Sequence, residues 1–220
     1  KLAELCSDYR STVVGPVTLT EDDKYVVAGF DEPPPRIAVF DLEACLAGGL
    51  TQEEGVYRVL EIPDQYVPCF GAGAAISAGS ERLVFSDCAS QEPTITVLNF
   101  ATGDGFFVGP GIAPSWSPDG SSIAFRGPDG IYVAGANGGE VRLVVGYVFP
   151  REPGRYEKWP AYPSWSPDGN WLVYHKCLSI TGSRDDCRKT QDFAIFKVNV
   201  GTGQEIKILD GGLNPYWRKR

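Results

Sequence analysis

The chain has 220 residues, of which 43% are hydrophobic and 22% are charged, and its formal net charge is −8 at pH 7. This length suffices for one all-β domain with a full core. The acidic charge, without a stripe of Lys and Arg, argues against nucleic acid as a partner. No apolar run approaches the ~20 residues of a membrane span. The chain begins with Lys, contains no Met and shows no signal peptide, so we expect a mature product or a fragment.

A sequence repeat organises the chain. In chain order its copies are Leu19–Val27, Ile76–Phe85, Pro114–Phe125, Pro163–Tyr174 and a fifth that starts at Pro215–Trp217. The third and fourth copies share the seven residues PSWSPDG, and their tryptophans, Trp116 and Trp165, are 49 residues apart. The first copy has Leu19 at the Trp position.

Each clear copy begins a series of strands. The Ser-Pro-Asp-Gly tract predicts a tight turn, because Pro presets φ, Asp can bond its own backbone and Gly accepts positive φ. We expect the following strands to be Ile123–Phe125, Ile131–Ala134 and Val141–Val145, and Leu172–Tyr174, Phe193–Val200 and Glu205–Leu209. A motif that occurs once per repeat serves the repeat, so we interpret PSWSPDG as a turn with a Trp between neighbouring units rather than as a ligand motif.

Self-similarity at this period, with strands between the copies, predicts an all-β fold, a β-propeller of four-stranded antiparallel blades. Four repeats are complete and a fifth is incomplete. We expect a segment at 1–16, followed by the propeller at 17–220, with blades at about 17–62, 74–109, 113–146 and 162–210 and a partial blade at 213–220.

The two PSWSPDG tracts, each followed by an apolar strand, resemble the repeat of the TolB-type propeller family, whose usual form is P-x-W-S-P-D-G. The resemblance extends from about Val17 to Trp217, although the first two copies keep only the pattern. TolB carries an additional α/β domain for which this chain has no room, so the resemblance implies the fold and not TolB's role. It also implies an extracytoplasmic bacterial module for binding or scaffolding, although some members are enzyme domains.

Six cysteines suggest disulfides and hence a secreted, periplasmic or cell-surface location. Their positions in the repeat favour two pairs that lie in loops on one side of the propeller and leave a third pair over. The expected bonds are Cys177–Cys187, Cys69–Cys88 and Cys6–Cys45. The alternative is a set of buried thiols in a cytosolic protein.

Residues 147–162 form a long insertion rich in aromatic and basic side chains, the composition of a protein interface. Its candidate binding residues are Tyr147, Phe149, Arg151, Arg155, Tyr156, Lys158, Trp159 and Tyr162. The same rings would also suit stacking on sugars, or they could cap the core.

No catalytic, metal or cofactor site is predicted. His175 is the only histidine, and we expect a surface or packing role for it at a strand end. One histidine excludes a multi-histidine metal centre of the kind found in propeller pectate-fragment lyases, and no G-x-S-x-G elbow is present. A glycosidase pair of acids drawn from distant loops stays open.

Two functional hypotheses follow. The first is a non-catalytic extracytoplasmic module for protein binding or assembly. The second is a carbohydrate-binding or carbohydrate-active propeller domain.

The count of strands also raises the question of how the ring closes. The N-terminal strand could close a compact ring, the chain could be part of a larger propeller, or neighbouring chains could donate strands to one another. We favour self-association or a missing partner, because an open propeller would expose a blade face.

Overall fold

This computed structural model describes residues 18–19, 25–30, 36–41, 56–69, 74–77, 81–146, 162–178 and 193–217. All regular elements in these ranges are strands, and they form four antiparallel four-stranded sheets. The first sheet contains β1 (Thr18–Leu19), β2 (Tyr25–Phe30), β3 (Arg36–Asp41) and β4 (Val56–Glu61). The second contains β5 (Ala74–Ile76), β6 (Arg82–Asp87), β7 (Thr94–Asn99) and β8 (Gly105–Pro110). The third contains β9 (Ile112–Trp116), β10 (Ser122–Arg126), β11 (Gly130–Gly135) and β12 (Val141–Gly146). The fourth contains β13 (Ser164–Trp165), β14 (Trp171–Cys177), β15 (Phe193–Asn199) and β16 (Glu205–Asp210).

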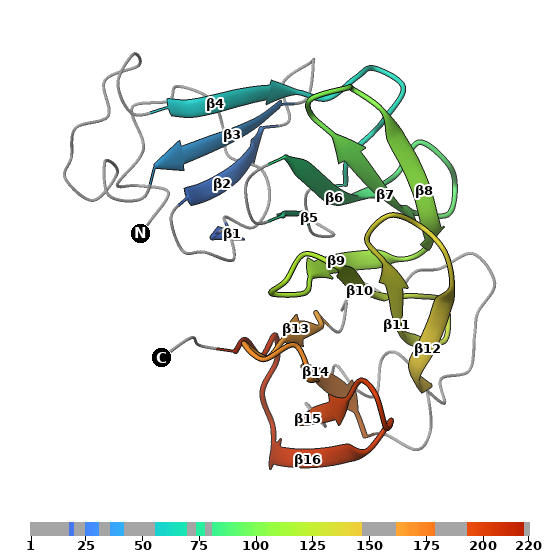
Figure 1. The fold of residues 1–220 in the computed structure, drawn as a ribbon. Coiled ribbons are helices and arrows are strands. Elements are labelled where there is room, and N and C mark those ends of the chain that lie inside the picture. Colours follow the sequence, from blue (N-terminus) through green and yellow to red (C-terminus); the bar gives the residue numbers. More distant parts are fainter. Residues whose placement is uncertain are drawn as a thin grey trace.

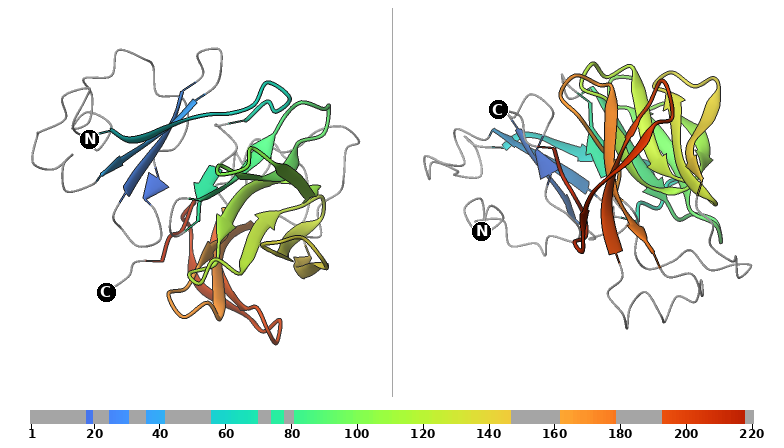
Figure 2. Two further views of the ribbon diagram at one scale, coloured as in Figure 1. Left: turned by 45° about the horizontal axis from the view of Figure 1, so that its top comes forward. Right: turned by 90° about the horizontal axis from the view of Figure 1, so that it is seen from below.

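The four sheets follow one another around an arc in chain order (Figures 1 and 2). In Figure 1 the first strand of each sheet lies toward the inside of the arc, and the fourth strand lies on the outside. Within every sheet the strands pair in sequence order, which is the meander predicted from the repeat. The predicted all-β fold of antiparallel four-stranded sheets is therefore confirmed.

The Ser-Pro-Asp-Gly tracts form the turns that join the first and second strands of the third and fourth sheets. In the first of them, Gly120 has a φ of 66° and donates its N–H to the Ser117 carbonyl at 2.8 Å. The Ser117 hydroxyl donates to Asp119 at 2.6 Å and accepts the N–H of Ser122 at 2.9 Å. Hydrogen bonds from the Ser117 hydroxyl and from Ser121 to the carboxylate lower the pKa of Asp119. Both polar side chains of the Ser-Pro-Asp-Gly tract are thus used inside the turn.

The Trp of each motif lies between two sheets. Trp116 is buried and donates its Nε1–H to the Ala75 carbonyl of the preceding sheet at 3.1 Å. Trp165 does the same to the Ser115 carbonyl at 3.1 Å. A buried indole N–H needs an acceptor, so the same hydrogen bond recurs at both junctions. The predicted position of the Trp between neighbouring units is confirmed for these two residues.

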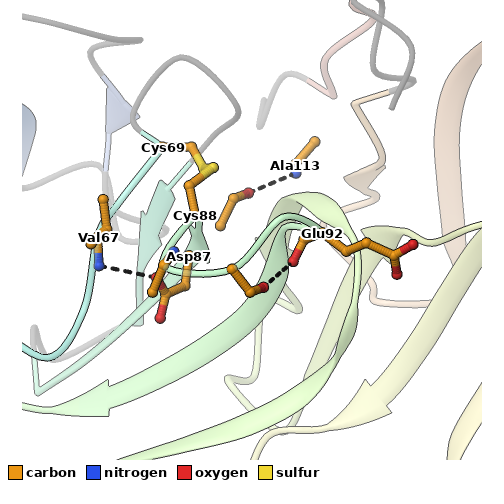
Figure 3. The surroundings of a disulfide bond; sticks show 9 residues. Val67, Cys69, Asp87, Cys88, Glu92 and Ala113 are labelled. Carbon is orange, nitrogen blue, oxygen red and sulfur yellow. Dashed lines mark hydrogen bonds between the residues drawn. A yellow bond between two sulfur atoms is a disulfide. The ribbon is translucent and has the colours of Figure 1, made fainter. Parts of the chain in front are cut away.

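Cys69 and Cys88 form a disulfide, with their Cα atoms 5.7 Å apart (Figure 3). It ties the connection that enters the second sheet to the end of β6. The same connection is held by the Val67 N–H, which donates to the Asp87 carboxylate at 3.0 Å. This is one of the three predicted pairs. Cys6, Cys45, Cys187 and the side chain of Cys177 lie outside the described residues, so the other two pairs stay predictions.

Removing the bond by the double substitution Cys69→Ser and Cys88→Ser should lower the free energy of unfolding by about 2–4 kcal/mol. The bond closes a loop with a sequence separation of 19, and its loss frees this loop in the unfolded chain. Urea denaturation of the variant and of the oxidised parent measures the difference. Equal midpoints, or a mass spectrum with free thiols at both positions of the parent, would show that the bond does not form.

Candidate binding site on the fourth sheet

The predicted binding loop falls almost wholly outside the described residues, which contain only Tyr162 of its eight candidates. Tyr162 lies just before β13 and is half-buried, and this burial raises the pKa of its phenol. Its partial burial agrees equally with a capping ring and with the edge of a binding surface. The loop therefore stays a prediction.

The second and third sheets each have two apolar faces, and both faces pack in apolar clusters with neighbouring parts of the chain. We call the side that contacts the following sheet the forward face and the opposite side the back face. On the second sheet, the forward face contains Val84, Ile95 and Val108, which pack against Trp116 and Phe125 of the third sheet. The third and fourth sheets meet in the same way, through side chains that include Ala124, Ile131, Val145, Leu172 and Tyr174.

The fourth sheet departs from this pattern at the outer half of its forward face. Leu209 pairs with Ile195 as Val145 pairs with Ile131 in the third sheet, yet Leu209 is 49% exposed and Val145 is 7% exposed. Ile208 is the bulge residue beside it and is 48% exposed, whereas its counterpart Val108 in the second sheet is 8% exposed. The same apolar positions are thus covered in the inner sheets and open in the last one.

The inner half of this face is covered by residues 211–217, which we call the C-terminal segment. In Figure 1 it returns from β16 to lie beside β13. The Trp217 N–H donates to the Ser164 hydroxyl at 3.3 Å, and a Cβ added at Gly212 would lie 3.4 Å from Cγ1 of Ile195. Ile195 is consequently buried.

The C-terminal segment repeats the backbone of a first strand. Asn214 lies three residues before Trp217 and has a φ of 51°, as Ala113, three residues before Trp116, has a φ of 56°. The Ala113 N–H donates to the Ser86 hydroxyl of the preceding sheet at 3.2 Å. The Asn214 N–H likewise donates to Nδ1 of His175 at 3.2 Å. Residues 214–217 therefore occupy the position at which a fifth sheet would begin.

His175 is 3% exposed, so the only histidine is a packing residue in this structure. The Phe193 ring lies edge-on to it, with centroids 5.8 Å apart. Because Nδ1 accepts the Asn214 N–H, this nitrogen is unprotonated and the neutral imidazole carries its proton on Nε2. Burial, together with the positive charge of Arg126, lowers the pKa of His175 from 6.5 to about 4.

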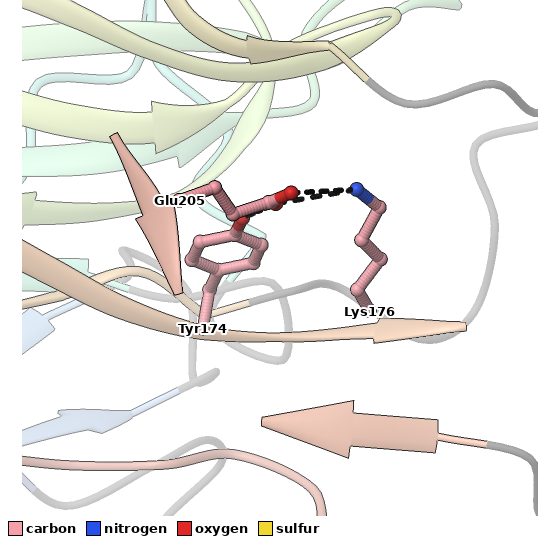
Figure 4. Close-up of polar contacts among 3 residues, drawn as sticks. All are labelled: Tyr174, Lys176 and Glu205. Carbon is pink, nitrogen blue, oxygen red and sulfur yellow. Dashed lines mark hydrogen bonds and ion pairs between the residues drawn. The ribbon is translucent and has the colours of Figure 1, made fainter. Parts of the chain in front are cut away.

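Glu205, one of the two acidic residues of β16, is engaged on the opposite, back face. The buried Tyr174 hydroxyl donates to the Glu205 carboxylate, and Nζ of Lys176 lies 3.2 Å from Oε1 of the same group (Figure 4). The second and third sheets have Phe85 and Phe125 at the position of Tyr174. Glu205, which is itself paired with Lys176, therefore supplies the polar partner that a tyrosine needs where a phenylalanine needs none.

The repeat predicts an exposed blade face but not which residues form it. Ile208 and Leu209 look like the other fourth-strand residues in the sequence, and they are accessible because none of the described sheets packs on this side of β16. The contact between Asn214 and His175 joins residues 39 positions apart, and no local sequence pattern predicts it. Ala113 and Ser86 hold the same two register positions in the repeat, although they are only 27 residues apart, and this register is the signal that could have found the contact.

The fold is similar to that of solved propeller proteins, although the sequences have diverged. TolB from Acinetobacter baumannii is 17% identical, with a TM-score of 0.57 over 94% of this chain and 46% of that chain. A TolB-like protein from Agrobacterium tumefaciens is 19% identical, with a TM-score of 0.60 over 92% of this chain and 64% of that one. An oligogalacturonate lyase in complex with manganese is 17% identical, with a TM-score of 0.59 over 93% and 55%.

These likenesses confirm the predicted resemblance to TolB-type propellers at the level of the fold. Neither a protein-family model nor a curated protein sequence matches the chain. The chain spans between 46% and 64% of the length of the three solved proteins. Their activities and partners therefore reach this chain only as proposals.

Two kinds of feature matter in the described ranges, a membrane-spanning helix and a cluster of metal ligands. No helix there has the length and apolar character of a membrane span. Within the same ranges, no three side chains of His, Cys, Asp or Glu gather as a metal site would require.

Substitutions at Val145 and Leu209 test whether the outer half of the face is open. Val145→Ala should lower the free energy of unfolding by about 1–3 kcal/mol, because it leaves a cavity between two sheets. Leu209→Ala, at the same register position, should change it by about 0.5 kcal/mol or less. Urea denaturation of both variants measures the two values. Equal losses would mean that Leu209 is covered in the isolated chain.

The neutral state of His175 predicts a pH dependence of stability. The folded chain resists protonation down to about pH 4, whereas the unfolded chain takes up the proton near pH 6.5. The contribution of the neutral His175 to the free energy of unfolding is therefore complete above pH 6.5. It is lost as the pH falls from 6.5 to about 4, by up to about 3 kcal/mol. His175→Asn, which can still accept the Asn214 N–H, should flatten this dependence. Urea denaturation at pH 7 and pH 4.5 provides the comparison, and the same slope in both proteins would rule out His175 as its source.

Proposed function

We propose that this chain is a non-catalytic propeller module that binds another protein outside the cytoplasm. The observation that carries the proposal is the uncovered apolar surface formed by Ile206, Ile208 and Leu209 of β16, next to Leu213 of the C-terminal segment. Soluble proteins leave a contiguous apolar surface open where a partner covers it. The fold neighbours support a propeller platform, and on such platforms function is carried by individual surfaces.

The disulfide between Cys69 and Cys88 supports a location outside the cytoplasm, because structural disulfides persist in oxidising compartments. The total of six cysteines agrees with this. We therefore propose a secreted, periplasmic or cell-surface protein.

We also propose that the ring of sheets is completed by assembly. Four sheets and the beginning of a fifth give an arc, and an added polypeptide would cover its open end. In the same proposal, the aromatic and basic loop at 147–162 is a second contact surface, with Trp159 and Arg155 as its anchors.

The alternative function is recognition of carbohydrate, which the fold likeness to an oligogalacturonate lyase favours. Its candidate surface is the same aromatic loop. Glu205, an acid of the fourth sheet, is bound to Tyr174 and Lys176 and is not placed to act as a catalytic acid on a bound sugar.

Photo-crosslinking tests the proposed protein partner. A photoreactive amino acid at position 208 should give a discrete crosslinked product with another protein in the cells that make the chain. The matched control is position 107, where Phe107 is exposed on β8, away from the fourth sheet. No product at 208, or equal products at both positions, would contradict the proposal. So would an oligosaccharide that raises the melting temperature of the chain and is consumed by it.

A further inference from the structure

We propose that Asn137 is a modification site: its side-chain amide is converted into a carboxylate by deamidation, and Arg82 directs this reaction to aspartate. Asn137 is exposed in the turn between β11 and β12, and Gly138 follows it. No other asparagine of the sequence has glycine after it. A glycine at this place favours deamidation, because no side chain hinders the approach of its backbone nitrogen. The site is separate from the binding surface proposed above.

Arg82, the first residue of β6, is held against this turn of the third sheet. Its Nη1 donates to the Ala136 carbonyl at 3.1 Å, and its Nη2 donates to the Gly120 carbonyl at 3.1 Å. Its guanidinium carbon lies 4.9 Å from the centroid of the Trp116 ring. Nη1 also donates to Oδ1 of Asn137 at 2.8 Å. Because a guanidinium only donates hydrogen bonds, the amide oxygen faces Arg82 and the amide nitrogen faces away from it.

The guanidinium lies where negative charge develops during deamidation. The Gly138 nitrogen loses its proton to water and attacks Cγ of Asn137, which places an oxyanion on Oδ1. Nη1 of Arg82 already donates to this oxygen, so it stabilises the tetrahedral intermediate. The bond between Cγ and Nδ2 then breaks, and Nδ2 takes up a proton from water and leaves as ammonia. The product of this step is a cyclic imide.

Water opens the imide at one of its two carbonyl carbons. Attack at Cγ breaks the new bond to the Gly138 nitrogen and gives aspartate in a normal backbone. Attack at the backbone carbonyl of residue 137 gives isoaspartate, in which the chain runs through Cγ. The oxygen on Cγ faces Arg82, so the guanidinium polarises this carbonyl and favours aspartate. The new carboxylate then pairs with Arg82 by a charge-assisted hydrogen bond, which the neutral amide cannot form as strongly.

The turn slows the reaction but leaves Arg82 in place. The Gly138 N–H donates to the Gly135 carbonyl at 3.1 Å, and this bond has to break before the nitrogen can attack. The bond of Arg82 to the Gly120 carbonyl and its contact with Trp116 lie outside the turn, so they persist when the turn opens. We therefore expect slower deamidation in the folded chain than in the denatured chain, with a different ratio of products.

Peptide mapping by mass spectrometry, after incubation at mildly alkaline pH, measures the two products at position 137. The denatured chain should give mainly isoaspartate, because the backbone carbonyl is the more reactive of the two without Arg82. In the folded chain we expect the ratio of aspartate to isoaspartate to be about fivefold higher or more. Asn99 and Asn199 end the third strands of the second and fourth sheets, and are followed by Phe and Val. They are the internal controls and should remain amides.

Two arginine variants separate the role of Arg82 from a general loss of contacts between sheets. Arg82→Met keeps an unbranched side chain but removes the donors, and its product ratio should fall to that of the denatured chain. Arg142→Met is the matched control, because Nη2 of Arg142 also donates to a carbonyl of a neighbouring sheet, that of Val200, at 2.8 Å. It should keep the ratio of the parent. Melting curves show whether both variants are folded.

A third variant tests the product without the reaction. Asn137→Asp should raise the melting temperature by about 1–3 °C, and high salt should remove this gain, because it screens the ion pair with Arg82. Four results would overturn the proposal: an amide that stays intact at position 137, isoaspartate as the main product of the folded chain, equal product ratios in Arg82→Met and Arg142→Met, and an Asn137→Asp variant that melts no higher than the parent.

Discussion

The burial of apolar faces between neighbouring sheets governs the second, third and fourth sheets of this structure. Burial of a Leu, Ile or Phe side chain contributes about 1.5–3 kcal/mol, whereas one hydrogen bond contributes about 1 kcal/mol. The apolar contacts between sheets therefore contribute more to stability, and the hydrogen bonds of Trp116 and Trp165 set the positions of the third and fourth sheets on the sheets before them. On the forward face of the fourth sheet, the C-terminal segment covers the inner half. Ile208 and Leu209 are left half-exposed, and covering both would contribute roughly as much as one fully buried side chain.

Four ionisable side chains in and beside the third and fourth sheets have structural roles that can be named. Asp119 and Asp168 accept hydrogen bonds inside their turns, which lowers the pKa of both carboxyl groups, that of Asp168 to about 2. The Glu205 carboxylate accepts a hydrogen bond from Tyr174 and pairs with Lys176. Nδ1 of His175 accepts the backbone N–H of Asn214 in the C-terminal segment. Among the described residues, the open apolar surface of β16 has no such role, and the proposed binding function rests on this contrast.

Local chemistry explains what could be predicted from the sequence. The turn residues at 117–120 and the apolar strand after them act over a few positions, so the repeat predicts strand order and the place of each Trp. The Cys69–Cys88 bond follows from the same register, because both residues lie in connections at one end of the second sheet. The contact of Asn214 with His175 and the exposure of Leu209 depend on which sheet lies next in space, which a single repeat does not encode. The loop at 147–162 stays a prediction.

Hydroxyl-radical footprinting of the isolated chain tests whether the fourth sheet is uncovered, because it reports the solvent exposure of individual side chains. Oxidation rates at Ile208 and Leu209 are compared with those at Val108 and Val145, each divided by the rate in the denatured chain. We expect Ile208 and Leu209 to be oxidised several times faster than the two valines, in line with exposures of 48% and 49% against 8% and 7%. Equal normalised rates at the four positions would show that the fourth sheet is already covered, and the open binding face would then not exist.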